Sequence, residues 1–157
     1  MGFYQFQKKQ NLNASIDEVW DFISSPANLK EITPPYMGFD ITTENLPEKM
    51  YPGMIISYIV KPLAGIPVNW VTEITEISEK KFFIDQQRIG PYSFWHHQHF
   101  LEPYDNTVQM TDIVSYKPPF GFIGSIANEI IIRRKIREIF DYREAVLRRI
   151  FPHKSKS

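Results

Sequence analysis

The sequence predicts an α+β domain in which a curved antiparallel sheet of about seven strands wraps around a long C-terminal helix. Two observations favour this class. Strand-like segments separated by short turns occupy residues 36–117, and an apolar stripe with helical spacing follows over 122–150. A helix of that length spans about 44 Å, whereas a domain of this size has a radius of gyration of about 15 Å. The helix therefore crosses the whole molecule, and a sheet must wrap around it to bury its stripe.

The N-terminal segment predicts one strand followed by two short helices. Residues 3–12 alternate loosely between polar and apolar side chains, as in a strand. Ser15 and Glu18 have the S-x-x-E spacing of a capping box, and an apolar helical face follows them. A second short helix near 27–32 must end before Pro34, because the residue that precedes a proline disfavours helix.

The middle of the chain predicts six further strands. Turns rich in Pro and Gly separate them, and links this short favour hairpins, hence an antiparallel meander. The predicted strands cover residues 37–44, 53–62, 67–78, 81–88, 93–103 and 107–117.

Composition limits the remaining possibilities. The 157 residues are 43% hydrophobic, which suits one core, so we expect a single domain over 1–151 with a flexible tail at 152–157. The chain has no Cys, which excludes disulfides, thiolate nucleophiles and Cys-based zinc sites. No apolar run approaches the roughly 20 residues of a membrane span, and the first residues lack a signal-peptide pattern. We therefore expect a cytoplasmic protein without stable membrane insertion.

Charge is balanced overall, with 18 basic and 18 acidic side chains, but not locally. Residues 133–157 hold nine basic and three acidic residues, a net charge of +6. This basic segment is typical of a solvated helix face, although a membrane-surface or protein interaction module is an alternative. No nucleic-acid-binding module is recognised, and a pI near 6.9 argues against a nucleic-acid partner. Common nucleotide-binding and serine-hydrolase motifs are also missing from the sequence.

The predicted hairpin over 93–103 and 107–117 gathers the main candidate site. A two-residue loop at 105–106 would pair His99 with Asp112. A slip of one residue would instead bring His96 and Gln98 to that face. Because side chains alternate along a strand, the first register places five side chains on one sheet face: Trp95, His97, His99, Asp112 and Tyr116.

Several chemistries could use this face. His97, His99 and Asp112 have donor types that suit zinc or iron, but H-x-H is a weak signal and no further ligand is evident, so we predict neither metal nor cofactor. A His–Asp pair can also act as an acid–base catalyst. It can orient an apolar ligand through a few polar groups, or it can simply hold two strands together. The third use, ligand anchoring, is our main hypothesis.

Other candidate residues surround this pair of strands. Trp70 is a possible cavity wall or an ordinary packed aromatic. Two loops that combine Pro, Gly and large apolar side chains, over 34–39 and 118–124, fit either lids or plugs of the core. Asp85, Gln87 and Arg88 lie on a predicted strand, where a charged residue usually faces solvent or is paired, and a ligand role for any of them is the lesser alternative.

The order of elements resembles the helix-grip fold of the START-like superfamily, also called SRPBCC. Two stretches strengthen the likeness: GPYSFWHHQHF at 90–100, and TDIVSYKPPFGFIG at 111–124 with the helix end IFDYREAVLRRIF at 139–151. They are similar to a bacterial subgroup of ligand-binding SRPBCC proteins related to polyketide cyclases and lipid-transport proteins. The resemblance implies a deep, largely apolar cavity between sheet and helix.

The function expected from this resemblance is binding or transport of a small hydrophobic or aromatic ligand. The alternative is a cyclase- or dehydratase-like lyase without a metal, in which His97 or His99 is the acid–base group and Asp112 orients it. Oligomeric state is left open. The expected ligand-binding residues are walls, anchors, lids and the helix face, namely Trp70, Trp95, Tyr116, His97, His99, Asp112, Met37, Phe120, Phe122, Ile126 and Ile130.

Overall fold

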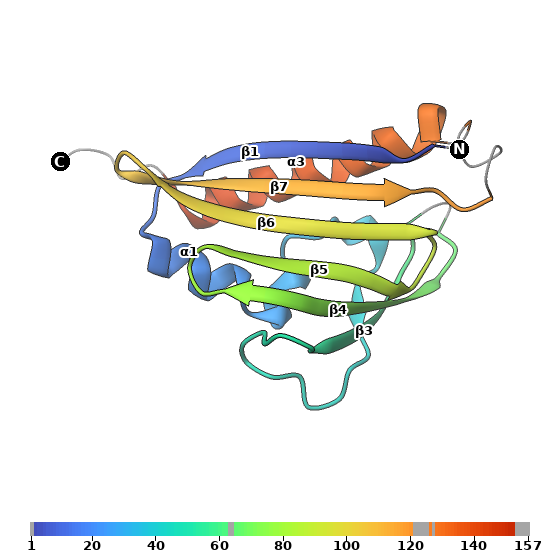
Figure 1. Ribbon diagram of the computed structural model, residues 1–157, viewed down its shortest axis with the longest axis horizontal. Helices are drawn as coiled ribbons and strands as arrows, with labels where there is room; N and C mark the ends of the chain where they lie inside the picture. The colour runs from blue at the N-terminus through green and yellow to red at the C-terminus, as the bar shows by residue number, and fades with distance from the viewer. Residues whose placement is uncertain (1, 63–64, 121–125, 127, 153–157) are drawn as a thin grey trace.

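One seven-stranded antiparallel sheet curves around the C-terminal helix in the computed structural model, which describes residues 2–62, 65–120, 126 and 128–152 (Figure 1). The strand order is β1-β7-β6-β5-β4-β3-β2. This arrangement confirms the predicted helix-grip α+β fold. The elements are β1 (Tyr4–Leu12), α1 (Ile16–Ile23), η1 (Pro26–Lys30), η2 (Pro35–Met37), β2 (Asp40–Ile41), β3 (Ile55–Val60), β4 (Val68–Ser78), β5 (Phe82–Ile89), β6 (Phe94–Tyr104), β7 (Thr107–Lys117), η3 (Asn128–Ile132) and α3 (Arg133–Ile150).

Helix α1 begins at the predicted capping box. The Glu18 backbone N–H donates to Ser15 Oγ at 3.2 Å, and the Ser15 N–H donates to Glu18 Oε2 at 2.7 Å. These two bonds satisfy backbone donors that the first turn of a helix leaves open. The helix then buries Val19, Trp20 and Ile23 against the sheet, and so closes one end of the molecule.

Two predicted elements differ from the structure. The strand expected over 37–44 shrinks to the two residues of β2, because Pro34 and Pro35 start a tight 3-10 turn and Gly38 then takes a left-handed φ of +53°. The helix expected over 122–150 is uniform α-helix only from Arg133, since η3 before it is a π-helical turn. Residues 153–157 of the expected tail lie outside the described residues.

The curvature of the sheet has a local cause in the pairing of β4 with β5. The register shifts twice along this pair, between Val71 and Thr72 and between Ile74 and Glu76. Such bulges bend a strand and increase its twist. The bend lets a single sheet wrap α3, which runs behind β1 and β7 in the view of Figure 1.

The interior has two parts, which we call the packed half and the hollow half. The packed half lies between α1, the end of α3 and the sheet, and its core is mainly aliphatic, with Leu12, Val19, Val108, Val146 and Leu147 at its centre. The hollow half contains an aromatic cluster built on Phe39 and Trp70. Among the helices that the structure describes, none is long and apolar enough to span a membrane.

Candidate functional site

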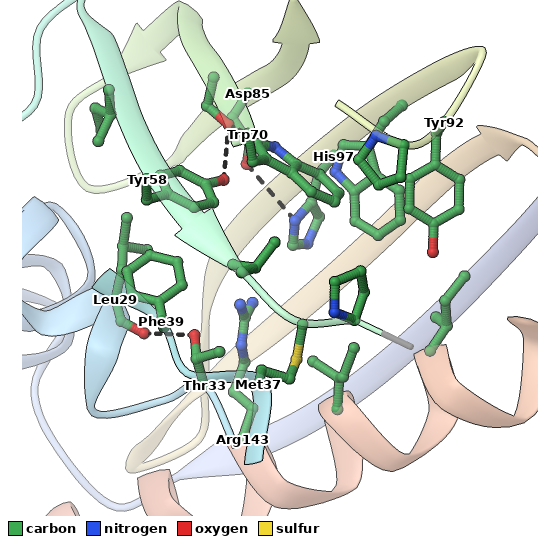
Figure 2. A pocket seen from close by; sticks show the side chains of 18 of the residues that line it. Leu29, Thr33, Met37, Phe39, Tyr58, Trp70, Asp85, Tyr92, His97 and Arg143 are labelled. Atoms are coloured by element: carbon green, nitrogen blue, oxygen red, sulfur yellow. Dashed lines mark hydrogen bonds and ion pairs between the residues drawn. The ribbon is translucent and has the colours of Figure 1, made fainter. Parts of the chain in front are cut away.

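The hollow half contains a cavity of about 200 Å³ between the sheet and α3 (Figure 2). One water occupies roughly 30 Å³ in the liquid, so the space suits a small molecule. Its walls come from β3, β4, β5, β6, η2 and α3. The lining includes Leu29, Thr33, Met37, Phe39, Met50, Ile56, Tyr58, Val60, Trp70, Thr72, Ile74, Phe83, Asp85, Tyr92, Trp95, His97, His99, Ile132, Lys135, Ile136, Ile139, Phe140 and Arg143.

Aromatic rings form a continuous wall on the sheet side of the cavity. The Tyr58 and Trp70 rings are stacked at 6.1 Å, Trp70 meets Trp95 edge-on at 5.3 Å, and Tyr92 lies 4.8 Å from Trp95. Two polar atoms of this wall are already paired, because Trp70 Nε1 donates to Thr72 Oγ1 at 3.0 Å and the Tyr58 hydroxyl lies 2.8 Å from the same oxygen. The wall therefore offers ring faces and edges, with those polar atoms satisfied internally.

The inner end of the cavity holds a cluster of two histidines and two aspartates. The rings of His97 and His99 lie 3.7 Å apart between the carboxylates. Nε2 of His97 is 2.9 Å from Asp112 Oδ1, and its Nδ1 is 3.5 Å from Asp85 Oδ2. Nδ1 of His99 is 3.0 Å from Asp112 Oδ1, and its Nε2 is 2.8 Å from Asp85 Oδ2. Each imidazole thus bridges the two carboxylates.

Arg143 approaches the cluster from α3. Figure 2 shows its side chain rising from the helix toward His97 and Tyr58. One guanidinium NH group lies 3.3 Å from Asp112 Oδ1, and the guanidinium sits 4.9 Å above the Phe140 ring. Its side chain is only 11% exposed. Its buried Nε has no hydrogen-bond partner among the described residues, and an unpaired buried donor of this kind costs free energy.

Burial and pairing separate the pKa values of the two histidines. Burial and the neighbouring His99 lower the pKa of His97 to about 4, although the carboxylates oppose this shift. Burial alone would also lower the pKa of His99, but its hydrogen bonds to Asp112 and Asp85 outweigh that effect and raise it. Near neutral pH, His97 is therefore neutral, and His99 is the histidine that holds a proton more strongly.

The carboxylates of the cluster are both ionised. Burial alone would raise the pKa of Asp112 and of Asp85, but hydrogen bonds to the histidines, together with the positive charges nearby, lower both. When His99 carries its proton, the two carboxylates, His99 and Arg143 sum to zero charge. A neutral cluster is the arrangement in which a buried set of charges is least costly.

The predicted register of β6 and β7 is confirmed. His99 pairs with Asp112, Trp95 with Tyr116, and Tyr104 with Thr107 across the two-residue turn. Met37, Trp70, Trp95, His97 and His99 all line the cavity, and their role in binding remains a prediction. Two other candidates are buried but lie outside the lining. Asp112 is behind the histidines, and Tyr116 packs behind Tyr92 and Trp95.

Three expected lining residues face elsewhere. Phe120 is 81% exposed, Ile130 68% and Ile126 49%, and none of them lines the cavity. Phe120 was expected as part of a loop lid, whereas the helical spacing that predicted Ile126 and Ile130 assumed a regular α-helix. The π-helical turn η3 accommodates an extra residue and rotates the apolar stripe, so that Ile132 and Ile136 face inward instead. Phe122 lies outside the described residues.

Sequence reasoning missed several cavity residues. Arg143 carries a usable signal, since it continues the helical spacing of the buried residues Ile136 and Phe140, where a charge is unexpected. Asp85 pairs with His97 across β5 and β6, and a longer loop hides that register in the sequence. The aromatic residues Phe39, Tyr58 and Tyr92 look like ordinary core residues by pattern.

The chain matches the family described as "Domain of unknown function (DUF8410)" over residues 10–151. It belongs to this family. Among proteins with curated descriptions, none matches the sequence significantly.

Solved structures share the fold at low sequence identity. A protein from Arthrobacter aurescens is 18% identical with a TM-score of 0.70, and the match covers 98% of this chain and 92% of that one. A protein from Thermus thermophilus is 11% identical with a TM-score of 0.70, over 98% and 100% of the two chains. Major latex-like protein 151 of ginseng, Panax ginseng, is 11% identical with a TM-score of 0.69, over 96% and 98%. Likeness at this identity shows the helix-grip fold alone.

Proposed function

We propose that this protein binds a small, mainly apolar molecule in the cavity between the sheet and α3. One observation carries the proposal: a cavity of about 200 Å³ has an aromatic wall on one side and a small group of polar side chains at its inner end. Ligand sites in proteins typically combine apolar walls with a few placed polar groups. The similarity of the β6, β7 and α3 sequences to ligand-binding SRPBCC proteins supports it.

The contacts of the lining limit the chemistry of the ligand. Tyr58 and Trp70 direct their polar atoms to Thr72, so they present ring surfaces that favour a flat apolar or aromatic body. Thr33 likewise donates to the Leu29 carbonyl at 2.7 Å. At the inner end, Arg143 retains an unpaired Nε–H among the described residues. An acceptor group on one end of the ligand, such as a carbonyl or carboxylate oxygen, would suit this donor.

Fluorescence tests the proposal directly. Trp70 and Trp95 line the cavity, so excitation of tryptophan should transfer energy to the apolar probe N-phenylnaphthylamine bound inside it. We expect saturable transfer at one probe per chain. Val60→Phe places a ring in the cavity, whereas Ile59→Phe adds the same ring on the other face of β3.

The two variants have opposite expected results. Val60→Phe should weaken probe binding at least about tenfold, equivalent to about 1.4 kcal/mol, and Ile59→Phe should leave it unchanged. Absence of saturable transfer in the unmodified protein would contradict the proposal. Equal binding by all three proteins would place the probe outside the cavity and would contradict it too.

A further inference from the structure

We propose that Asp85, His97 and His99 form a binding site for one divalent first-row transition-metal ion at the inner end of the cavity. This inference goes beyond the proposed function, because an apolar molecule can occupy the aromatic part of the cavity whether or not an ion is bound. Two imidazole nitrogens and one carboxylate oxygen are a donor set typical of zinc and of non-haem iron.

The donor atoms already converge. One ligating atom from each of the three residues lies within 4.8 Å of the other two. Asp85 Oδ2 is 2.8 Å from Nε2 of His99 and 3.5 Å from Nδ1 of His97. Around a tetrahedral ion with bonds near 2.1 Å, neighbouring donors are about 3.4 Å apart. The separation to His97 already matches that value, and the shorter one to His99 must lengthen once its shared proton is replaced by an ion.

Asp112 orients both histidines from behind. A carboxylate accepts hydrogen bonds, so the nitrogens that contact Asp112 Oδ1, which are Nε2 of His97 and Nδ1 of His99, are the protonated ones. The lone pair of His97 Nδ1 then turns toward Asp85, and His99 Nε2 presents its lone pair there once its proton is released. Metal-binding histidines commonly donate their second N–H to a carboxylate in this way. Here a single carboxylate, itself contacted by Arg143, serves both rings.

A purely structural cluster leaves one contact unexplained. His99 can share a second proton with Asp85, which accounts for the distance of 2.8 Å. Nε2 of His97 donates to Asp112 Oδ1, so its Nδ1 presents a lone pair, yet this atom faces Asp85 Oδ2 at 3.5 Å. Two acceptors that face one another are stabilised by a cation between them. A divalent ion would contact all three acceptors at once and replace the proton that His99 shares with Asp85.

The position of the three residues indicates the kind of site. All of them line the cavity, whereas Asp112 does not. Three protein ligands with a side open toward a cavity are typical of sites that keep a coordination position for water or a small molecule. The sequence-based prediction of no metal treated Asp112 as the third ligand. The structure gives that place to Asp85 and makes Asp112 a positioning residue.

Cobalt provides the test, because Co²⁺ bound by nitrogen and oxygen donors absorbs visible light. The full chain is treated with a chelator, freed of it, and titrated with Co²⁺. We expect one equivalent to bind, with an absorption band that Zn²⁺ abolishes on displacing the cobalt. Asp85→Asn and His99→Gln should lose stoichiometric binding. Asp112→Asn should weaken it by about 10–100-fold, the usual effect of losing a group that orients a metal ligand.

A matched control is available within the same chain. The sequence has four histidines, and the double variant His96→Ala with His153→Ala leaves only His97 and His99. His96 is on the opposite face of β6, where it contacts Gln86. The double variant should bind Co²⁺ as the unmodified protein does. Circular dichroism and binding of N-phenylnaphthylamine on the same samples report folding and the apolar site separately.

Three results would overturn the proposal. The unmodified protein could show no absorption band at stoichiometric Co²⁺, a result that depends on no variant. Folded Asp85→Asn could bind as tightly as the unmodified protein. The double histidine variant could lose the band. If the band is absent while the apolar probe still binds, the metal proposal fails alone and the proposed function stands.

Discussion

The packed half and the hollow half are built on the same sheet but filled differently. In the packed half, aliphatic side chains such as Leu12, Val108 and Leu147 are 2% exposed or less and interlock under α1. In the hollow half, the rings of Trp70, Trp95 and Tyr92 contact one another edge-on or at a tilt. Branched aliphatic side chains fill irregular gaps, whereas rigid rings that contact one another leave space in front of their faces.

The polar cluster lies at the boundary between the two halves. Phe83 belongs to the packed core, lines the cavity and stacks on His99 at 4.0 Å. Asp112 lies deeper and accepts contacts from both histidines and from Arg143. The cavity therefore ends at a group of charged side chains that must stay fully paired, and not at a gradual loss of packing.

Removing the Asp112 carboxylate, which contacts both histidines and Arg143, should have the largest effect on stability. Asp112→Ala leaves protonated His99 and Arg143 buried with one carboxylate between them. Breaking a buried ion pair in this way typically lowers the free energy of unfolding by about 3–5 kcal/mol. Urea denaturation near neutral pH measures the change. A loss below about 1 kcal/mol would show that the cluster does not support the fold.

The next largest effect should come from shortening a side chain to alanine, and its size should differ between the two halves. Leu147→Ala opens a new void in the packed half and should lower the free energy of unfolding by about 3 kcal/mol. Ile139→Ala removes a side chain that already borders the cavity and should cost about 1 kcal/mol, since fewer contacts are lost. Denaturation of both variants under one set of conditions gives the ratio of their losses in free energy of unfolding. Equal losses would mean that the hollow half is as tightly packed as the other.

Acid should destabilise the metal-free protein through His97. Its pKa is about 4 in the folded state against an ordinary value of 6.5. The unfolded chain therefore binds a proton between these values that the folded chain does not, and stability falls as pH falls through that window, by about 3 kcal/mol in all. His99, whose pKa is raised, opposes this slope near pH 6.5, where the folded chain holds its proton more fully, and adds none at lower pH, where both states hold it.

A series of denaturation curves between about pH 6.5 and pH 5 measures this slope before the carboxylates begin to titrate. His97→Gln should flatten it. A protein whose stability is constant across that range would contradict the assignment of His97 as the neutral partner.

Enlarging side chains should give the smallest but most discriminating difference. Val108→Phe overfills the packed half and should cost about 1–3 kcal/mol. Val60→Phe extends into existing space and should change stability by less than about 1 kcal/mol. Thermal melting of both variants, with the unmodified protein alongside, compares them. A larger loss for Val60→Phe than for Val108→Phe would contradict the division into halves.

Much of the fold could be predicted because its signals are local. The capping box at Ser15 and Glu18 lies within one helical turn, and the two-residue loop at 105–106 fixes the register of β6 on β7. Asp105 has a φ of +49°, the backbone conformation that such tight hairpins require. The loop length and the alternation of side chains are therefore enough to predict that His99 lies opposite Asp112.

The rest depends on contacts that the sequence does not encode locally. The partner role of Asp85 follows from the pairing of β5 with β6 across a longer loop. The inward face of the helix depends on η3, since a π-helical turn interrupts the spacing from which Ile126 and Ile130 were placed. Whether aromatic residues pack or enclose a cavity is decided by the curvature of the whole sheet, which periodicity does not report.

Methyl NMR tests the central claim most directly. In a protein with labelled Ile, Leu and Val methyl groups, N-phenylnaphthylamine should shift the signals of Val60, Ile136 and Ile139, which line the cavity. The signals of Leu12, Val108 and Leu147 in the packed half should stay in place. Shifts confined to the packed half or to exposed methyl groups, or no shifts at saturating probe, would contradict a ligand-binding cavity in the hollow half.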